Sequence, residues 1–517
     1  MVAGYRWAAM VSEHGSAPRP GAAAGALLLL AALLAGCGSG SGGPSSPTAS
    51  PASGRAATVR GQDWTRFGYD AARTNIGPRN VGIGPRTLRR LHRRVVRLPG
   101  TVDSSPIYLH AVRVGKRRRD VFIVTTTYGR TLAIAATSGR RLWQFKPRSV
   151  AGLERSPQIT NTTPVADPDR RFVYAASPDG RIHKLSLRTG REAGGRWPVS
   201  ITHDPAHEKL ASALNLSGGY VIAVTGGYIG DEPPYQGHVV EISRRTGGIA
   251  RVFNTLCSDR RQIMDPRSCP STLSAIWARA GAVVEPGTHR LLVTTGNGPF
   301  NGQTDWGNSV LELTPGLSVR QSYTPPDHAQ LEATDSDLGS TVPALLPAPG
   351  GRRPQFALQG GKDGKVRLLS LSRLNGRATQ ASPLTGGELQ ILRPPRGQLA
   401  FTTPAVWRTG RRVIVLTADF QGTVAYELRG SPPRLHVLWD NGTPGSSPVL
   451  AGGLLYVYDV TNGGLNVYRP LSGRRLATLA AGSGHWNSPI VADGRIALPE
   501  GNANEHATSG VLDIYSR

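Results

Sequence analysis

The sequence predicts an all-β fold: an eight-bladed β-propeller of four-stranded antiparallel blades, closed by an N-terminal strand that joins the last blade. Three observations predict it. A phrase of sequence recurs in degenerate form to the end of the chain, its spacing is regular, and the last unit lacks a strand that the first can supply. A sheet of this kind cannot bury both of its faces alone, so its repetition implies that one unit stacks on the next.

The phrase is complete near Asp103. It runs from an opening turn, 103–106, through a buried strand, 121–124, and an alternating strand, 129–134, to an outer strand, 137–143, that carries Trp143. Opening turns recur at Thr163-Pro164, Ser212-Ala213, Ser274-Ala275, Thr341-Val342-Pro343, Thr403-Pro404, Ser447-Pro448 and Ser488-Pro489. Third strands recur at 180–185, 237–242, 308–313, 364–369, 422–426, 464–468 and 510–515. The strands are short, β-branched and bounded by Gly, Pro, Asp or Asn. Eight units share residues 62–517, about 57 residues for each, which is enough for four strands and one long loop.

The two ends of the chain complement each other. The last unit stops at Arg517, directly after its third strand, and the segment 91–98 precedes the first opening turn without strands of its own to join. We therefore expect 91–98 to supply the missing fourth strand and to leave no open edge. The alternative is two stacked β-sandwich domains, which regular unit spacing disfavours.

The N-terminus is typical of a bacterial lipoprotein. An apolar stretch, 22–34, leads into Leu34-Ala35-Gly36-Cys37, after which a signal peptidase would cut and whose Cys37 would receive lipid. A transmembrane anchor is disfavoured because the apolar run is shorter than the roughly 20 residues that span a bilayer. We therefore predict a signal peptide at 1–36, with translation starting at Met1 or Met10, a flexible tether at 37–61 and the propeller at 62–517. This leader predicts an extracytoplasmic protein anchored to the cell membrane.

Lipidation of Cys37 leaves Cys257 and Cys269, both in one loop between two units. An extracytoplasmic location permits a disulfide between them, which would stabilise the fold by about 3 kcal/mol; two buried thiols are the alternative.

The formal net charge is +26, yet Arg accounts for nearly all of the 60 basic residues. No recognition helix or aromatic-lined sheet accompanies this charge, so we expect no nucleic-acid partner and instead attraction to anionic lipids or wall polymers. We expect a monomer.

The compact group of metal-ligand residues is His203-Asp204 with His207-Glu208. Two His residues four apart face one metal only on a helix, and Pro205 lies between them, so we expect a solvated loop.

The phrase ending in Trp143, together with Asp63-Trp64 and Arg73-Thr74-Asn75, resembles the quinoprotein (pyrroloquinoline-quinone, PQQ) propeller superfamily. The resemblance covers essentially the whole mature chain. That superfamily contains PQQ-dependent alcohol dehydrogenases and also non-catalytic envelope lipoproteins that act as scaffolds. Fold alone does not choose between them.

The resemblance to the enzymes implies roles for four residues. Asn297, in 294–298, is similar to the calcium-binding Asn beneath the quinone, and Asp337, in 335–339, to the catalytic Asp that takes the alcohol proton. Lys362, in 361–364, looks like the residue that reaches the quinone oxygens. Trp277 falls near the Trp on which the quinone stacks. Each also has a structural interpretation, as a turn, a cap, a hairpin or inter-blade core.

Two departures argue against catalysis. The calcium-binding Glu of the enzymes is replaced by Tyr228, which is a poor Ca²⁺ ligand. Asp231 or Glu232 could substitute for it only if their loop turns inward. The segment 156–163, where the enzymes carry an adjacent Cys-Cys disulfide, has no Cys. Our first hypothesis is therefore a non-catalytic binding or scaffold protein of the cell envelope, with a protein or glycan partner. The alternative is a PQQ- and Ca²⁺-dependent alcohol dehydrogenase that uses the axial site.

Overall fold

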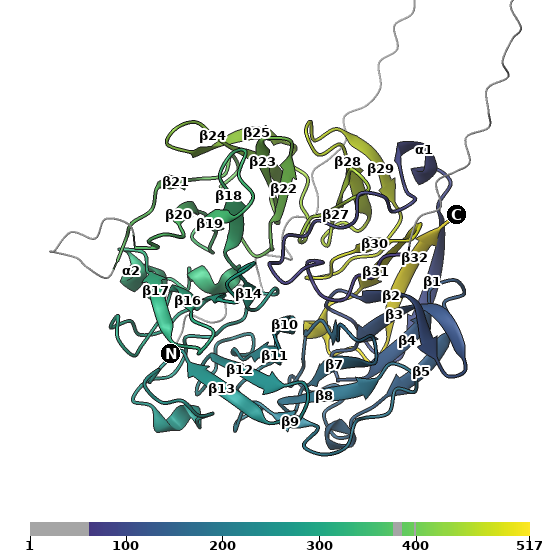
Figure 1. Ribbon diagram of the computed structural model, residues 1–517, viewed down its shortest axis with the longest axis horizontal. Coiled ribbons are helices and arrows are strands. Elements are labelled where there is room, and N and C mark those ends of the chain that lie inside the picture. Colours follow the sequence, from purple (N-terminus) through teal and green to yellow (C-terminus); the bar gives the residue numbers. More distant parts are fainter. Residues whose placement is uncertain (1–60, 376–384, 398–399) are drawn as a thin grey trace, which may run out of the picture. The chain divides into compact units, whose positions relative to one another are not determined.

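The computed structural model describes residues 61–375, 385–397 and 400–517. Cys37, the leader and the tether lie outside these residues. Contacts divide the chain into 1–58 and 59–517, and the second unit is the one described below. Within it, 32 strands form eight separate four-stranded sheets, arranged as blades around a centre (Figure 1). The predicted eight-bladed propeller is confirmed.

The blades follow one another along the chain and surround the centre of the ring in Figure 1. Blades 1 to 4 consist of β2 (Ile107–Val114), β3 (Arg117–Thr125), β4 (Thr131–Ala135) and β5 (Arg141–Phe145); β6 (Val165–Ala166), β7 (Phe172–Ser177), β8 (Arg181–Ser186) and β9 (Val199–Ser200); β10 (Asn215–Ser217), β11 (Tyr220–Val224), β12 (His238–Ser243) and β13 (Ile249–Asn254); and β14 (Val283–Val284), β15 (Leu291–Thr294), β16 (Val310–Leu313) and β17 (Val319–Tyr323).

Blades 5 to 8 complete the ring. They consist of β18 (Ala344–Pro347), β19 (Pro354–Gln359), β20 (Val366–Ser370) and β21 (Gln390–Leu392); β22 (Ala405–Thr409), β23 (Arg412–Ala418), β24 (Thr423–Arg429) and β25 (Arg434–Asp440); β26 (Val449–Ala451), β27 (Leu454–Tyr458), β28 (Leu465–Tyr468) and β29 (Arg475–Leu479); and β30 (Ile490–Ala492), β31 (Arg495–Glu500), β32 (Gly510–Ser516) and β1 (His92–Leu98).

Blade 8 joins the two ends of the chain, as the sequence predicts. β1 pairs antiparallel with β32 over its whole length, from His92 opposite Ser516 to Leu98 opposite Gly510. Arg93 of β1 also forms ion pairs of 2.8 Å with Glu500 and with the fully buried Asp513. Because β1 completes the blade, the ring has no unpaired strand edge at its junction.

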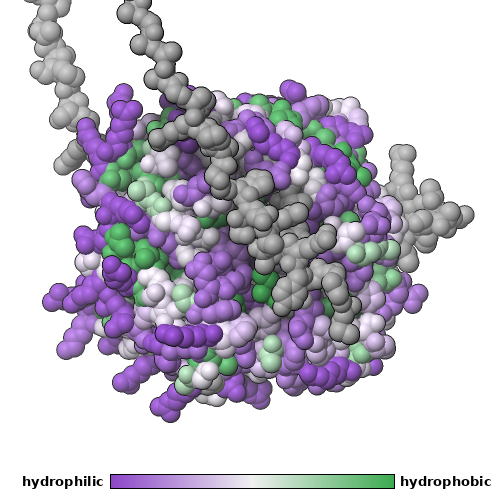
Figure 2. Space-filling model, turned by 180° about the vertical axis from the view of Figure 1, so that it is seen from behind, coloured by the Kyte–Doolittle hydropathy of each residue, from purple (hydrophilic) through white to green (hydrophobic). Residues whose placement is uncertain are grey.

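The helices are short. They are α1 (Pro85–Leu88), α2 (His328–Ala333) and the 3₁₀ turns η1 (Arg148–Val150), η2 (Pro266–Ser268), η3 (Leu338–Ser340) and η4 (Ala503–Glu505). Over the described residues, no helix has the length and apolar character to cross a membrane. The face in Figure 2 is mainly hydrophilic, with hydrophobic side chains in smaller groups.

The Trp of the repeated phrase holds neighbouring blades together. Trp143 of β5 donates a hydrogen bond of 2.9 Å from Nε1 to the carbonyl oxygen of Leu187, in the next blade. A Cβ at Gly190 of that blade would lie 2.7 Å from the Trp143 ring, so only Gly permits this contact. Trp439 and Gly473 repeat the arrangement between blades 6 and 7. The spacing of Trp and Gly in the repeat thus reflects contacts between blades.

The segment 63–77 crosses the middle of the ring (purple in Figure 1) and pairs with the innermost strands. Trp64 exchanges backbone hydrogen bonds of 2.8 Å with Tyr108 of β2, and Gly77 donates one to Leu450 of β26. Fully buried Arg73 donates to the carbonyl oxygens of Phe67 and Leu214, at 2.7 and 2.9 Å. The motif that resembles the quinoproteins near the N-terminus therefore ties several blades together at the axis.

Candidate functional site

The side chains of the candidate site lie in segments that precede or connect the strands of blades 4 and 5. Trp277 precedes β14, Asp335 and Asp337 precede β18, Asn297 follows β15, and Lys362 lies between β19 and β20. We call these five residues the Lys362 cluster. The structure brings all four residues that the enzyme resemblance singled out into this one group.

Lys362 is the centre of the cluster. Its ammonium nitrogen forms ion pairs with Asp335 Oδ1 at 2.7 Å and with Asp337 Oδ2 at 2.6 Å. It also lies 5.2 Å from the centroid of the Trp277 ring, which is the distance of a cation–π contact. Asn297 donates from Nδ2 to Asp335 Oδ1 at 2.9 Å. The site is therefore cross-linked by its own charges.

Asp337 is the perturbed acid of the cluster. Its side chain is buried, and its Oδ1 atom has no hydrogen-bond partner among the described residues. Burial raises the pKa of Asp337 to about 6, although the charge of Lys362 opposes the shift. Burial alone would lower the pKa of Lys362, but Asp337 and Asp335 raise it above its usual value. A carboxylate with this pKa can accept a proton near neutral pH.

Tyr228, which the resemblance aligns with the Glu of the enzymes, has its hydroxyl engaged outside the Lys362 cluster. Its hydroxyl donates to the carbonyl oxygen of Pro205 at 3.0 Å. Asp231 is exposed and accepts a hydrogen bond of 2.9 Å from Tyr235. Although the residue as a whole is exposed, partial desolvation of its carboxylate raises the pKa of Asp231 and the charge of Lys362 opposes this shift, so this acid belongs to the same electrostatic neighbourhood. Among the described residues, no three His, Cys, Asp or Glu side chains form a group that could hold a metal ion.

These residues do not fit a Ca²⁺ ion bearing a quinone. The ammonium of Lys362 already lies between the two carboxylates, and a dication beside it would be repelled. The Asn297 amide is held by Asp335. The Trp277 ring is contacted by Lys362 and by Phe401, whose centroid is 6.1 Å away. The arrangement therefore supports no reaction step that passes through Ca²⁺ and a quinone.

A second group, which sequence reasoning missed, surrounds Asp103 in the first opening turn. Asp103 is fully buried and accepts hydrogen bonds from Asn161 Nδ2 at 2.9 Å, His485 Nδ1 at 2.7 Å, Trp486 N at 3.0 Å and Ala503 N at 3.1 Å. These donors precede β6 and β30 or lie between β31 and β32. Asp103 thus connects blades 1, 2 and 8.

Two cations accompany this carboxylate. Arg279 Nη2 lies 3.6 Å from Asp103 Oδ2, and Lys209 is close enough for its charge to act on His485. Burial would raise the pKa of Asp103, but His485 and Arg279 hold it well below its usual value. The carboxylate is therefore ionised, and His485 donates to it as a neutral ring, because burial lowers the pKa of His485. We call Asp103, Lys209, Arg279 and His485 the Asp103 cluster.

Aromatic rings connect the two clusters. Phe401 lies 6.1 Å from Trp277 and stacks at 5.2 Å on Trp486, measured between ring centroids. Phe420, which is 45% exposed, lies 5.3 Å from Trp486. The Trp486 ring is also 5.9 Å from the Arg279 guanidinium carbon. The aromatic residues come from blades 4, 6 and 8, so no local pattern in the sequence groups them.

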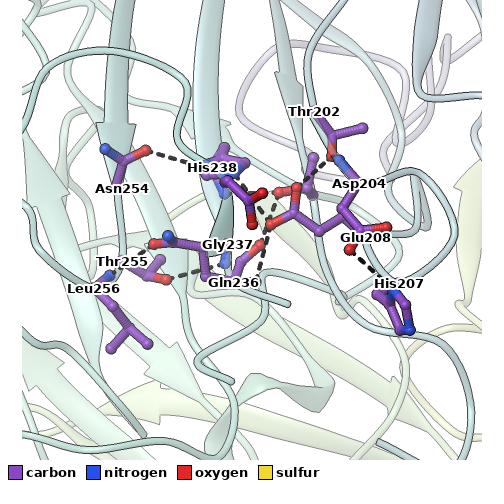
Figure 3. Close-up of polar contacts among 12 residues, drawn as sticks. Thr202, Asp204, His207, Glu208, Gln236, Gly237, His238, Asn254, Thr255 and Leu256 are labelled. Carbon is purple, nitrogen blue, oxygen red and sulfur yellow. Dashed lines mark hydrogen bonds and ion pairs between the residues drawn. The ribbon is translucent and has the colours of Figure 1, made fainter. Parts of the chain in front are cut away.

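The metal-like group of the sequence is split by the fold. Asp204 accepts a hydrogen bond of 2.9 Å from His207 Nδ1 and pairs with Arg267, while Glu208 points to the opposite side (Figure 3). The expectation of a solvated loop holds for exposed His203 but is wrong for Glu208, which is fully buried. Pro205 and the turn at 204–208 place the two carboxylates in different environments.

Glu208 forms a buried contact with His238 of β12. The Glu208 Oε1 atom lies 3.2 Å from His238 Nε2 and accepts from Gln236 N at 3.1 Å, while His238 Nδ1 lies 2.7 Å from Asn254 Oδ1 (Figure 3). Burial would lower the pKa of His238, but Glu208 and Asn254 raise it. This contact fixes the segment that carries Lys209.

Cys257 and Cys269 form a disulfide in the structure, with Cα atoms 6.3 Å apart. The bridge lies between β13 and β14, next to a small apolar group that includes Leu256 and Met264. It closes the long loop between blades 3 and 4.

Comparison with known proteins supports the fold. Residues 95–254 match a family model described as outer membrane protein assembly factor BamB. No curated protein sequence matches the chain. Solved structures with the same fold include a europium-containing methanol dehydrogenase, at 14% identity and a TM-score of 0.63, covering 88% of this chain and 98% of that one.

Two further structures are similar. Quinohemoprotein alcohol dehydrogenase from Comamonas testosteroni is 16% identical with a TM-score of 0.60, covering 88% of this chain and 80% of that one. BamB from Moraxella catarrhalis is 13% identical with a TM-score of 0.51, covering 83% and 100%. Identities this low establish the fold and leave function to the site. The matched repeats and the shared eight-bladed architecture confirm the resemblance of this chain to the PQQ-like β-propeller repeat superfamily.

Proposed function

We propose that this protein is a lipid-anchored, extracytoplasmic propeller of the cell envelope that binds a partner and carries out no chemistry at its axis. The observation that carries the proposal is the ion-pair network of the Lys362 cluster. Lys362 pairs with Asp335 and Asp337, Asn297 donates to Asp335, and the Lys362 charge lies between the carboxylates that a metal would need.

Two further observations support an envelope role. The pattern that ends at Cys37 is typical of lipoproteins. The family model that matches 95–254 is named for an outer membrane protein assembly factor, which points to a protein partner for this propeller. The positive net charge of +26 would hold the molecule near anionic lipids or wall polymers.

A PQQ- and Ca²⁺-dependent alcohol dehydrogenase is the second candidate. It is favoured by the meeting of Trp277, Asn297, Asp337 and Lys362 in one cluster, and by Asp337, whose free Oδ1 and raised pKa suit a base. In that function Asp337 would hold the alcohol proton. The Lys362 network would first have to rearrange.

Titration of the purified protein with PQQ, with and without Ca²⁺, tests the choice. Binding is followed by tryptophan fluorescence, and turnover by reduction of a dye with alcohols. We expect no binding at high micromolar PQQ. Calcium-dependent binding that is lost in Asp337→Ala and Asn297→Ala, but kept in the exposed control Asp169→Ala, would establish the enzyme instead.

The anchor has its own test. Cys37→Ala should move the protein from the membrane fraction to the soluble fraction of the producing cells and prevent its labelling with a lipid precursor. Labelling that persists in this variant would contradict a lipoprotein anchored at Cys37.

A further inference from the structure

The Asp103 cluster carries more positive charge than it balances. It holds two basic side chains, Lys209 and Arg279, and one carboxylate, while His485 is neutral as the hydrogen-bond donor to Asp103. Asp103 already accepts four hydrogen bonds from other groups. Below about pH 7, where Lys209 is protonated, the described residues therefore leave one unit of positive charge in this cluster without a counter-charge.

Neither cation has the partners that buried charges need. Arg279 Nη1 is enclosed and has no hydrogen-bond partner among the described residues, and the ion pair of Nη2 with Asp103 is 3.6 Å long. The Lys209 residue is 8% exposed, and across the described chain its ammonium contacts only the Tyr228 ring, at 5.8 Å. Buried charges are normally paired, so this arrangement is incomplete.

The backbone holds both cations in place. Lys209 exchanges two hydrogen bonds with Gly226, of 2.6 and 2.9 Å, and follows Glu208, which is fixed by His238. The Arg279 carbonyl oxygen accepts from Ala213 N at 2.8 Å. These hydrogen bonds fix the backbone from which the two basic side chains extend.

The surroundings select the kind of anion. The guanidinium presents paired N–H donors that match a carboxylate, and the Trp486 ring beside it, stacked on Phe401, offers an apolar wall. The side chains of Arg279 and His485 are 12% and 22% exposed, so solvent reaches the group. One missing negative charge beside aromatic rings suits an organic monocarboxylate.

We propose that Lys209 and Arg279 form a binding site for the carboxylate of a ligand whose carbon skeleton packs against Trp486 and Phe401. The carboxylate belongs to a free small molecule or to a partner chain that inserts an acidic side chain or its C-terminus. This inference goes beyond the proposed function, because it rests on the Asp103 cluster and stands whether or not the Lys362 cluster is catalytic.

Titration calorimetry of the purified protein with benzoate tests the site, and benzamide, its neutral counterpart, is the control ligand. We expect benzoate to bind with one-to-one stoichiometry and benzamide at least about tenfold more weakly, since a charged acceptor roughly doubles hydrogen-bond strength. Lys209→Met and Arg279→Met should each weaken benzoate at least about tenfold. Lys116→Met, which removes an exposed charge from the β2–β3 turn, should not.

The pH dependence provides a second signature. Burial, followed by the Arg279 charge, lowers the pKa of Lys209 to about 7, and Asp103 opposes the shift; His485 and the Tyr228 ring are the other groups that face the ammonium. Benzoate stays ionised throughout, so its affinity should decrease as pH rises above about 7, when Lys209 loses its proton. The Lys209→Met variant should lose this dependence.

The melting temperature gives a measurement that does not need a variant. Benzoate should raise it in a concentration-dependent way, and benzamide should not. Equal binding of benzamide, equal weakening by Lys116→Met, or no heat and no thermal shift at about 10 mM benzoate would overturn the proposal. A short peptide with a free C-terminal carboxylate, compared with its amidated form, then tells whether a partner chain or a free molecule is the ligand.

The outcomes separate this proposal from the proposed function. Benzoate binding without PQQ binding supports both. PQQ binding that depends on Asp337 but survives in Lys209→Met overturns the proposed function alone. If neither benzoate nor PQQ binds, the carboxylate site is overturned and the proposed non-catalytic function is retained.

Discussion

Replacement of Asp103 by Asn should destabilise the propeller strongly, although the two side chains have nearly the same shape. The carboxylate uses both oxygens: Oδ2 accepts from Asn161, His485 and the Ala503 amide, and Oδ1 accepts from the Trp486 amide. An Asn keeps one acceptor, so at least the Trp486 N–H would face an NH₂ group. An unpaired buried donor costs about 1–3 kcal/mol.

The lost charge adds to this effect. Arg279, whose side chain is 12% exposed, would lose its ion pair with the Asp103 carboxylate, and removal of one partner from a fully buried ion pair costs about 3–5 kcal/mol. Because the contact is 3.6 Å long and solvent reaches it, we expect its loss to lower the free energy of unfolding by about 2 kcal/mol. The sum predicts that Asp103→Asn lowers the free energy of unfolding by about 3–5 kcal/mol.

Urea unfolding of the purified protein, followed by tryptophan fluorescence and circular dichroism, measures this difference. Ser104→Ala is the matched control, because the neighbouring Ser104 hydroxyl is buried without a hydrogen-bond partner and its loss should change stability by less than about 1 kcal/mol. A free energy of unfolding for Asp103→Asn within about 1 kcal/mol of the values for the wild type and for this control would refute the prediction.

Three further predictions follow from the described contacts. Arg93→Met should lower stability by about 1–3 kcal/mol, because Asp513 is left buried without its cation; Arg94→Met, an exposed change on the same strand, should have no effect in the same urea titration. The pKa of Asp337 is about 6 in the folded protein and near 4 in the unfolded chain, so the folded state holds the proton more tightly. The free energy of unfolding should therefore fall by about 3 kcal/mol as pH rises from about 4 to above 6. Asp337→Asn should remove that part of the pH profile, and an unchanged profile would contradict the assignment. Cys257→Ser, which removes the disulfide, should lower the free energy of unfolding by about 3 kcal/mol and so lower the melting temperature. A reducing agent should lower the melting temperature of the wild type to the same extent and leave that of the variant unchanged.

The repeated sequence motif made the fold predictable from the sequence. Each unit had to bury its sheet against the next. The sequence placed Trp143 on an outer strand, and the structure adds that its ring packs on Gly190 of the next blade. The ends were equally informative, because a last unit with three strands needs a partner for its edge, and β1 supplies it through the pairing of His92 with Ser516. Local patterns such as these determine hydrogen bonding between adjacent strands, which is why the prediction succeeded.

The site was predictable only in part. Short motifs indicated Asn297, Asp337 and Lys362, and the structure brings them together, but no motif states that Lys362 pairs with Asp335 as well as Asp337. The turn after Pro205 was expected to be solvated, yet Glu208 is buried against His238. Residue type and spacing predict which groups are present. They do not predict which group neutralises which.

The sequence by itself determined the number of blades and the way the ring closes, because these follow from repetition. Its resemblance to the quinoprotein enzymes singled out Trp277, Asn297, Asp337 and Lys362. The tertiary structure alone decided the Asp103 cluster. Asp103 and His485 are 382 positions apart, and Lys209 and Arg279 belong to other blades. They meet only because ring closure brings the segments before the innermost strands to one axis, where burial makes the balance of charges decide what can bind.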